Sequence, residues 1–370
     1  MRIVVDYRPA LSARTGVGEY IHHLVRAFAA TTRDEVVVFT SSWKDRPQAG
    51  LAASLGAQVI DRHVPVRLLN YLWHRCEWPP IERIVGAVDV AHSPHPLLLP
   101  ARRAAQVIMI HDLFFLDHPD STAGEIRRDY PSRAASHARR AHAVITSTAH
   151  VKHQVIERLG VVPEAVHVCT PGAPTWQSLG REPNIPREGC VLFLGTLETR
   201  KNLGVLLDAY TRLLDRRVAV PSLVLAGRAT PSAAPWLARI GQPPLAGHVS
   251  HVGYVPDAQR EALYRSARLL VLPSLDEGFG FPVLEAMSAG VPVVASARGS
   301  LPEVLGPAGA LVDATDPDAL AAAIERGVSD DDWARGAAQA GLDRARGFQW
   351  SQAADSLRLA YVSAVERRAR

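Results

Sequence analysis

The stretch LLVLPSLDEGFGFPVLEAMSAGVPVVAS (residues 269–296) points most directly to the fold class. It opens with the apolar run LLVL (269–272) and closes with VPVVA (291–295), and both runs have the length of a buried strand. Between them, Pro282 suits the first position of a helix and Gly290 its end. A strand, a helix and a second strand in this order are typical of a parallel sheet covered on both faces, so the stretch predicts an α/β fold.

Short apolar runs alternate with helix-length segments through the rest of the chain as well. They are RIVVD (2–6), EVVVFT (35–40), VDVAH (88–92), QVIMI (106–110) and AVIT (143–146) in the first half, and CVLFL (190–194) and SLVLA (222–226) in the second. Residues 171–189 are rich in Pro and Gly and lack periodicity, which is typical of a linker. We therefore expect two Rossmann-like parallel-sheet domains, residues 1–178 and 179–350, that face each other across a ligand-binding cleft.

Length and composition agree with a soluble two-domain protein. The chain has 370 residues, of which 47% are hydrophobic and 21% charged, which argues against a disordered, collagen-like or coiled-coil protein. No apolar stretch reaches the roughly 18 residues of a membrane span, and Asp6 and Arg8 interrupt the start where a signal peptide is apolar. We therefore expect a cytoplasmic protein. Cys76, Cys169 and Cys190 lack metal-ligand spacing and are odd in number, so neither a zinc site nor a disulfide framework is predicted.

The positive charge is concentrated in the first half of the chain. Residues 1–175 carry 20 Lys and Arg against 16 Asp and Glu, whereas the remainder carries 21 of each. A solvated basic face explains this most simply, and a surface that meets anionic lipid headgroups or phosphorylated substrates is the alternative. Nucleic acid is not an expected partner, because the arginines of residues 127–140 are not set in a known reader motif.

The segment RLLNYLWHRCEWPP (67–80) places Tyr71, Trp73 and Trp78 among arginines. Aromatic residues in such a setting form the lip of an acceptor site, contact a membrane surface, or pack inside the protein. The sequence leaves these three interpretations open.

Two glutamates eight residues apart, Glu277 and Glu285, mark the candidate ligand site. Glu277 lies in the loop after the strand and Glu285 in the first turns of the next helix, so both can face a ligand at the helix N-terminus, where N–H groups suit phosphate. Acidic side chains beside phosphate are best explained as acceptors for sugar or ribose hydroxyls. Gly278 and Gly280 let the backbone approach the ligand, and Phe279 covers an apolar or ring face. The simpler alternative is that Glu277 caps the helix and Glu285 pairs with an exposed base.

A second cluster, GTLETRKNLGVLLDAYTRLL (195–214), follows the strand CVLFL. Asn202 is the predicted N-cap of a helix, with Arg200 and Lys201 just before it. Cations at this place oppose the helix dipole by a few tenths of a kcal/mol, which makes sense if an anion such as a diphosphate lies between. Two solvated bases are the alternative. We expect Lys201 to share one cavity with the two glutamates.

Two weaker signals lie in the first half. The turn RTGVGEY (14–20) has Gly16 and Gly18 before a helix, but it lacks the third glycine of a dinucleotide fingerprint. His111 and Asp112 follow the strand QVIMI, where parallel sheets bind their ligands. A structural and a functional histidine are both consistent with this position.

These motifs carry a family resemblance. DEGFGFPVLEAMSAGVPVVAS (276–296) resembles the E-x7-E signature of retaining glycosyltransferases of the GT-B fold, family 4, which contains many bacterial mannosyltransferases. The resemblance extends over nearly the whole chain, because RTGVGEY, IHDL (110–113), ITSTAHVKHQVIERLGV (145–161), GTLETRKN and HVGYVPDAQREALYRSARLLVLPS (251–274) occur in the family's order. It implies a first domain that binds the acceptor, a second that binds a nucleotide-sugar, and a closing helix, here residues 351–370, that returns to the first domain.

The resemblance also implies roles for single residues. Glu277 contacts hydroxyls of the transferred sugar, Glu285 the nucleotide ribose and Lys201 the diphosphate. Many relatives carry an arginine where this sequence has Thr196, and Arg200 is the candidate replacement.

Further implied contacts come from both domains. His111 lies beside the donor sugar, and backbone around Gly16 approaches the diphosphate. Tyr254 and Val255 lie near the base.

The expected function is retaining transfer of a hexose from a nucleoside diphosphate to a hydroxyl of a glycan or lipid-linked acceptor, without a metal or a cofactor. The resemblance favours GDP-mannose as donor and a role in polysaccharide or lipopolysaccharide biosynthesis, in the cytoplasm or peripherally on the cytoplasmic membrane face. A UDP- or dTDP-sugar donor and a non-catalytic nucleotide-sugar-binding relative are the alternatives. A dehydrogenase is disfavoured, because the glycine fingerprint is incomplete.

Overall fold

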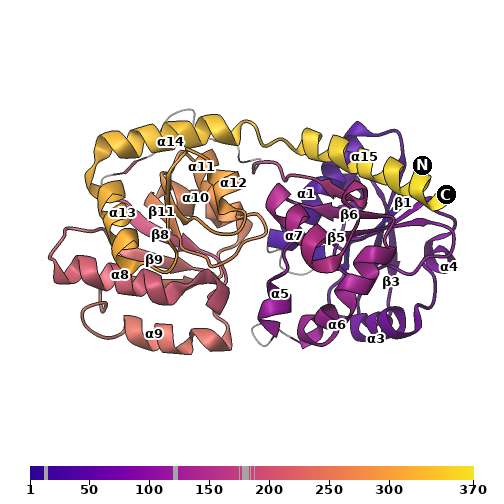
Figure 1. The fold of residues 1–370 in the computed structure, drawn as a ribbon, viewed down its shortest axis with the longest axis horizontal. Coiled ribbons are helices and arrows are strands. Elements are labelled where there is room, and N and C mark those ends of the chain that lie inside the picture. The colour runs from indigo at the N-terminus through magenta and orange to yellow at the C-terminus, as the bar shows by residue number, and fades with distance from the viewer. Residues whose placement is uncertain (12–15, 120–123, 175, 177–182, 184, 187) are drawn as a thin grey trace. The chain divides into compact units, whose positions relative to one another are not determined.

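The computed structural model describes the chain except for residues 12–15, 120–123, 175, 177–182, 184 and 187 (Figure 1). The described residues form two compact units: unit 1 comprises residues 1–172 and 349–370, and unit 2 residues 173–348. The predicted boundary between residues 178 and 179 falls outside the described residues. The sequence predicts the second boundary after residue 350, whereas unit 1 resumes at Gln349, directly before the last helix.

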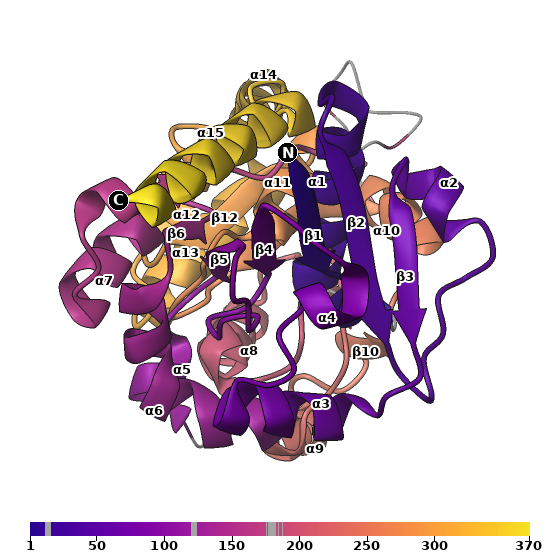
Figure 2. The same cartoon turned by 90° about the vertical axis from the view of Figure 1, so that its right-hand side faces the viewer.

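Unit 1 is built on a parallel sheet. Over the described residues the strand order is β3-β2-β1-β4-β5-β6-β7, and Figure 2 shows β3 to β6 side by side. The strands are β1 (Arg2–Asp6), β2 (Glu35–Ser41), β3 (Gln58–Arg62), β4 (Val90–Ser93), β5 (Ala105–Ile110), β6 (Ala143–Thr146) and β7 (Val166–Val168). The sequence marks all of them except β3 and β7. These two are the edge strands: β3 has no fully buried residue and β7 has only three residues.

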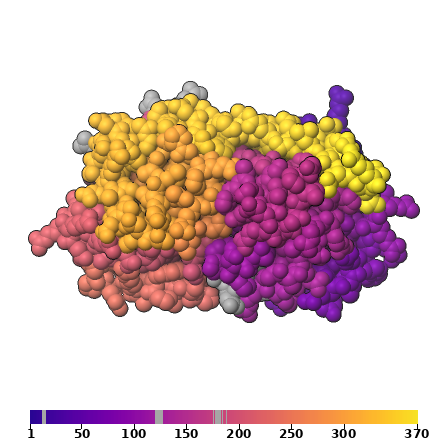
Figure 3. Space-filling model, viewed as in Figure 1, coloured from indigo at the N-terminus to yellow at the C-terminus, as the bar shows by residue number. Residues whose placement is uncertain are grey.

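Helices accompany the strands of unit 1. They are α1 (Gly16–Thr31), α2 (Leu51–Leu55), α3 (Val66–Tyr71), the π-helix η2 (Leu72–Cys76), α4 (Glu82–Val85), α5 (Phe114–Asp117), α6 (Gly124–Arg140), α7 (Ala149–Leu159) and α15 (Trp350–Ala369). The predicted apolar face of α1, which includes Ile21, Leu24 and Phe28, is buried. Part of it packs against α15, which also contacts β5 and β6 and lies along the surface of unit 1 (Figure 3).

Unit 2 is a second parallel sheet. Over the described residues its strand order is β10-β9-β8-β11-β12-β13. The strands are β8 (Cys190–Leu194), β9 (Leu223–Ala226), β10 (Val249–Gly253), β11 (Ala267–Leu272), β12 (Val293–Ser296) and β13 (Ala310–Val312). The four central strands contain the predicted apolar runs, whereas β10 and β13 at the edges are only partly buried and are not predicted.

Helices lie on both faces of the sheet of unit 2. They are α8 (Leu203–Asp215), α9 (Ala234–Ile240), α10 (Asp257–Arg265), α11 (Phe281–Ser288), α12 (Leu301–Leu305), α13 (Pro317–Ser329) and α14 (Asp331–Ala345). Helix α13 packs against α8, and α11 packs against α14. In Figure 1, α8 and α9 lie below the strands of this unit and α11 and α14 above them. Two parallel sheets, each with its own helices, confirm the predicted α/β class with Rossmann-like units.

Candidate active site

The order of strands in unit 2 indicates where a ligand binds. From β8 the chain runs outward to β9 and β10, and from β11 it runs outward in the other direction to β12 and β13. The neighbours β8 and β11 therefore form a topological switch point, and ligands of open α/β sheets bind beyond the carboxyl ends of such strands. The loops that leave these two ends carry the two motifs that the sequence singles out, residues 195–202 and 273–280.

The carboxylate of Glu277 is the centre of a buried cluster between these loops. Its Oε1 accepts hydrogen bonds from Lys201 Nζ at 2.5 Å and from Ser274 Oγ at 2.7 Å. Its Oε2 accepts one from Arg200 Nη1 at 3.0 Å. The side chains of Glu277 and Lys201 are only 6% and 9% exposed. The structure thus brings the two predicted clusters into direct contact.

Backbone contacts hold the loop around Glu277 in place. The N–H of Leu275 donates to the carbonyl of Arg200 at 2.8 Å, which ties the two loops together. The N–H of Ser300 donates to the carbonyl of Glu277 at 3.0 Å. Gly299 has a φ of 60°, and a Cβ at this position would lie 2.6 Å from the backbone nitrogen of Glu277. A side chain at residue 299 would therefore displace the loop that carries Glu277.

Charge pairing outweighs burial at Glu277. Burial alone would raise the pKa of this carboxyl group, but the Lys201 ammonium and the Arg200 guanidinium lower it to about 2. Burial lowers the pKa of Lys201, and the negative charge of Glu277 opposes that shift. Glu277 is therefore ionised at neutral pH, and its charge favours the protonated form of Lys201.

The cluster keeps hydrogen-bonding capacity for a ligand. Within the described part of the chain, Glu277 is the one hydrogen-bond partner of the Lys201 ammonium, so two of its three N–H donors remain. Oε2 of Glu277 accepts a hydrogen bond from Arg200 there and retains a second acceptor position. A ligand with an anionic oxygen beside a hydroxyl group would accept from the remaining N–H donors of Lys201 and donate to the remaining acceptor position of Glu277.

Glu285 is held by two side chains of α10. Its Oε1 accepts a hydrogen bond from Arg260 Nη1 at 2.6 Å and its Oε2 one from the Tyr264 hydroxyl at 2.7 Å. Burial raises the pKa of Glu285, and both partners oppose this shift. Each oxygen keeps one further acceptor position, which suits two neighbouring hydroxyls.

The simpler alternative, in which Glu277 caps the helix and Glu285 pairs with an exposed base, is confirmed only in part. Glu285 does pair with a base, but the side chain of Arg260 is only 14% exposed. The N-cap position of α11 is occupied by Gly280, so Glu277 does not have the capping role of that alternative.

Arg200 lies at the site and is engaged by carboxylates. Besides Glu277, its Nε and Nη2 contact Glu198 Oε1 at 3.2 and 3.1 Å, and its Nη1 donates to the carbonyl of Asp276 at 3.1 Å. These contacts give it a clear part in positioning Glu277. Its role as a second phosphate cation in place of the arginine that is missing at Thr196 stays a prediction.

Asn202 occupies the predicted N-cap position of α8, but its side chain does not cap the helix. Its φ is 56°, and the side chain makes no capping hydrogen bond. Its Nδ2 donates instead to the carbonyls of Pro273 at 3.1 Å and Ala314 at 2.6 Å. Because these carbonyls follow β11 and β13, Asn202 fastens the turn that carries Lys201 to the neighbouring loops.

Phe279 faces the hydrophobic core of unit 2. It is 5% exposed, and its ring centroid lies 5.1 Å from that of Phe281, which leaves little of the ring to cover a ligand. Gly280 has a φ of 98°, a backbone conformation that the loop itself demands of a glycine. Contact of Gly278, Phe279 and Gly280 with a donor stays a prediction.

Tyr254 and Val255 follow β10 at the same edge of the sheet. Tyr254 is 40% exposed, and the guanidinium carbon of Arg228 lies 4.6 Å from its ring centroid. Val255 is half-buried and packs against the core of unit 2.

The two remaining predicted residues, His111 and Gly16, belong to unit 1. His111 follows β5, and its Nε2 lies 3.2 Å from the carbonyl oxygen of Pro94. Because that oxygen only accepts, the proton is on Nε2 and the lone pair on Nδ1. Burial lowers the pKa of His111 to about 4, so the ring is neutral at pH 7. Gly16 is the exposed first residue of α1, and the turn before it lies outside the described residues.

The described residues contain no group of three or more His, Cys, Asp or Glu that is placed to hold a metal ion. None of their helices combines the length and the apolar character that a bilayer span requires.

Sequence reasoning missed four residues that shape the site: Ser274, Arg260, Tyr264 and Gly299. Arg260 and Tyr264 stand four residues apart on one face of α10, and this spacing is a signal that the sequence offers. Ser274 and Gly299 carry no local signal, because their importance comes from contact with Glu277.

Glu277 makes the stability of unit 2 depend on pH. Its pKa is about 2 in the folded protein and near 4.5 in the unfolded chain, so its stabilising effect is complete above pH 4.5 and is lost as the pH falls toward 2. We expect the difference in unfolding free energy between the wild type and Glu277→Gln to shrink over this window. Chemical denaturation at a series of pH values measures that difference. A difference that stays constant from pH 7 to pH 3 would contradict the ion pairing.

Comparisons with known proteins agree with this geometry. A family model described as Glycosyltransferase Family 4 matches residues 14–177, and one described as Glycosyl transferases group 1 matches residues 188–330. O-antigen chain mannosyltransferase B of Escherichia coli is 33% identical over 272 residues, a match that covers 70% of this chain and 71% of that protein.

Solved structures share the fold. Sucrose-phosphate synthase from Thermosynechococcus elongatus superposes with a TM-score of 0.77 at 21% identity, and the match covers 98% of both chains. Anabaena HepE in complex with UDP and glucose gives a TM-score of 0.71 at 18% identity, covering 98% of this chain and all of that one. Both resemble this chain over its whole length.

Proposed function

The chain belongs to glycosyltransferase family 4 (glycosyl transferases group 1) and has the GT-B fold, and on this premise we propose that it transfers a hexose to a hydroxyl of a glycan or lipid-linked acceptor with retention of the anomeric configuration. The preferred donor is GDP-mannose. Unit 2 holds the donor and unit 1 the acceptor. A role of His111 and Gly16 of unit 1 in donor binding stays a prediction.

One observation carries the proposal. A buried ammonium group with spare donors, Lys201, touches a buried carboxylate with a spare acceptor position, Glu277, at the switch point of a parallel sheet. A phosphate oxygen satisfies the first group and a sugar hydroxyl the second. Glu285, on the helix that follows, offers two acceptor positions to the hydroxyls of the ribose. A nucleotide-sugar carries these three chemical groups on one molecule, with the diphosphate between the sugar and the ribose.

Lys201 stabilises the leaving group. As the bond between the anomeric carbon and the diphosphate oxygen breaks, negative charge grows on that oxygen, and a preorganised cation in a buried site lowers the barrier by several kcal/mol. The acceptor oxygen forms the new bond on the same face of the sugar, and its proton passes to the departing phosphate oxygen. Glu277 orients the sugar through its hydroxyls and keeps Lys201 protonated.

Mannose is the preferred sugar because the relative at 33% identity is named a mannosyltransferase of the O-antigen chain. That name also supports a role in polysaccharide or lipopolysaccharide biosynthesis. The UDP and glucose bound to HepE keep UDP-sugars as the alternative donors.

Incubation of the purified protein with GDP-mannose, UDP-glucose, UDP-galactose and dTDP-rhamnose, each with mannose-terminated oligosaccharide acceptors, tests the function. We expect release of a nucleoside diphosphate from one donor and, by proton NMR, the same anomeric configuration in product and donor. An inverted product would contradict the mechanism. Saturable binding of a donor without product over a wide acceptor panel would identify a non-catalytic relative.

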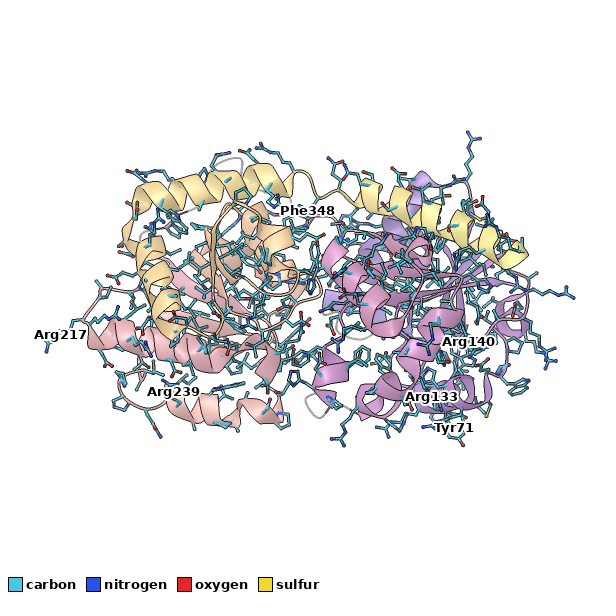
Figure 4. All side chains as sticks on the ribbon, in the orientation of Figure 1. Tyr71, Arg133, Arg140, Arg217, Arg239 and Phe348 are labelled. Atoms are coloured by element: carbon cyan, nitrogen blue, oxygen red, sulfur yellow. The ribbon has the colours of Figure 1, made fainter. Side chains whose placement is uncertain are left out.

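A segment of unit 1, residues 67–78, presents exposed apolar residues next to arginines. In the segment 67–78, Leu68, Tyr71 and Trp78 are 51%, 59% and 49% exposed, and Tyr71 points outward in Figure 4. The side chain of Arg75 in the same segment is 44% exposed. Trp73 is different: it is 1% exposed and belongs to the core, so the third interpretation of this segment holds for it alone. Exposed aromatic residues among cations suit the interface of an anionic bilayer, where a lipid-linked acceptor resides.

Sedimentation with phosphatidylcholine vesicles, with and without phosphatidylglycerol, tests this membrane contact. We expect binding to the anionic vesicles that weakens with salt, and loss of binding in Tyr71→Ser/Trp78→Ser. Leu359→Ser on α15 removes an apolar residue that is even more exposed, at 68%, and serves as the control. Absence of binding at low salt would contradict the contact.

A further inference from the structure

Arg228 and Tyr254 form a stacked pair at the carboxyl edge of the sheet of unit 2. Arg228 follows β9 and Tyr254 follows β10, and the guanidinium carbon lies 4.6 Å from the ring centroid. Both side chains are exposed. A cation over an exposed aromatic ring gains only about 0.5–1 kcal/mol, so the pair is worth little to the stability of the fold.

Backbone hydrogen bonds fix the two loops that carry the pair. The carbonyl of Arg228 accepts from the N–H of Leu197 at 2.8 Å, and the N–H of Gly227 donates to the carbonyl of Gly253 at 2.7 Å. The His251 ring adds a contact from Nε2 to the carbonyl of Gly227 at 2.8 Å. The loops that follow β8, β9 and β10 are therefore joined to one another by hydrogen bonds, and two of them carry the pair.

The proposed diphosphate site lies at the same carboxyl edge of the sheet as the pair. A Cβ on Gly227 would lie 1.9 Å from the carbonyl oxygen of Gly195, and one on Gly195 would lie 3.4 Å from Cε of Lys201. The turns after β8 and β9 are thus in contact, with Lys201 beside them. Neighbouring strands are about 4.8 Å apart, so the ends of β8 and β10 are about 10 Å apart. This is the reach of a nucleoside diphosphate from its second phosphate to its base.

Helix α10 connects the pair to the proposed ribose site. The helix begins at Asp257, shortly after Tyr254, and its Arg260 and Tyr264 hold the carboxylate of Glu285. A ribose on Glu285 would therefore have its base directed toward the start of α10, where the stacked pair stands.

We infer that Arg228 and Tyr254 recognise the base of the donor and favour guanine over uracil and thymine. This inference rests on the proposed function and assigns its donor class. The guanidinium of arginine has two parallel N–H groups, which match the paired acceptors O6 and N7 of guanine. Uracil and thymine present a single acceptor, O4, on the corresponding edge, and adenine presents a donor beside N7. Contact with the Tyr254 ring restrains rotation of the guanidinium group and so keeps its two parallel N–H groups, the fork, directed at the base.

Isothermal titration calorimetry with GDP, UDP and dTDP tests the inference without any sugar or acceptor. For the wild type we expect GDP to bind at least tenfold more tightly than UDP and dTDP. Arg228→Ala should weaken GDP binding about tenfold to a hundredfold, the range of one bidentate base contact, and change UDP binding less than threefold. Arg228→Lys keeps the charge without the fork and should resemble the alanine variant.

Arg217→Ala is the matched control. Arg217 is an exposed arginine in the connection between α8 and β9, at the opposite edge of the sheet, and Figure 4 shows it at the outer end of unit 2. The Arg217→Ala variant loses the same charge as Arg228→Ala and should bind GDP with the affinity of the wild type. Equal affinity of the wild type for GDP and UDP, or an equal loss of both in Arg228→Ala, would contradict the base assignment and leave the proposed function in place. Binding of no nucleoside diphosphate at all would contradict both.

Discussion

Replacement of Lys201 by methionine should lower the turnover number of sugar transfer about a hundredfold to a thousandfold, the effect of removing one preorganised electrostatic contact to a developing anion. Methionine keeps much of the length of the side chain and removes the charge. The Michaelis constant for the donor should change less, because the charge on the leaving oxygen is larger in the transition state than in the bound donor. Steady-state kinetics with a saturating acceptor measure both quantities.

The structural role of Lys201 must be separated from its catalytic role. Lys201→Met leaves the buried carboxylate of Glu277 with one cation fewer, and breaking a buried pair in this way costs about 3–5 kcal/mol. The double variant Lys201→Met/Glu277→Gln removes both charges and should recover part of that loss in thermal denaturation. Its activity should remain as low as that of the single variant. Recovery of activity together with stability would show that Lys201 acts only through the fold.

Replacement of Glu277 by glutamine should lower the turnover number about a hundredfold, through two effects. The neutral amide weakens the hydrogen bond to a sugar hydroxyl, since bonds to charged groups are about twice as strong. It also removes the negative charge that opposes the effect of burial on Lys201, so the pKa of Lys201 falls further in the variant. The second effect predicts that activity of the variant is lost at a lower pH than that of the wild type as the pH rises.

Glu366→Gln is the control for this substitution. Glu366 is exposed on α15 of unit 1, and the change removes the same charge from the molecule. The control should retain wild-type kinetics. If Glu277→Gln also keeps more than half of the wild-type turnover number, the carboxylate has no part in transfer.

The architecture could be predicted from the chain because buried strands have a distinctive composition. Runs such as LLVL and CVLFL lie in the centre of their sheet, shielded on both sides, and are therefore apolar throughout. The edge strands β3, β7, β10 and β13 are short or partly exposed, so their sequences lack this signature.

The contact between Glu277 and Lys201 could be anticipated because both follow neighbouring parallel strands, whose carboxyl ends share one edge. One error concerns a residue whose role depends on distant partners. Asn202 stands at the N-cap position, yet its amide donates to two carbonyls of other loops. For Trp73 the sequence left burial and exposure open, because its segment mixes buried residues such as His74 with exposed ones such as Tyr71, and the packing of unit 1 places Trp73 in the core.

The two residues that bind the carboxylate of Glu285 show a different limit of prediction from the sequence. Arg260 and Tyr264 lie on one face of a helix that the resemblance covers, but their function depends on their hydrogen bonds to Glu285, which belongs to another helix. Helix contacts of this kind are not encoded in local periodicity. Arg228 and Tyr254 likewise come from two loops that meet only because β9 and β10 are neighbours.

A crystal structure of the protein with bound GDP tests the central claim most directly. It should show the diphosphate at the carboxyl ends of β8 and β11, with an oxygen within about 3 Å of Lys201 Nζ, and the ribose hydroxyls on the carboxylate of Glu285. Clear density for the nucleotide at any other place on unit 2, with the Lys201 and Glu277 pair untouched, would contradict it.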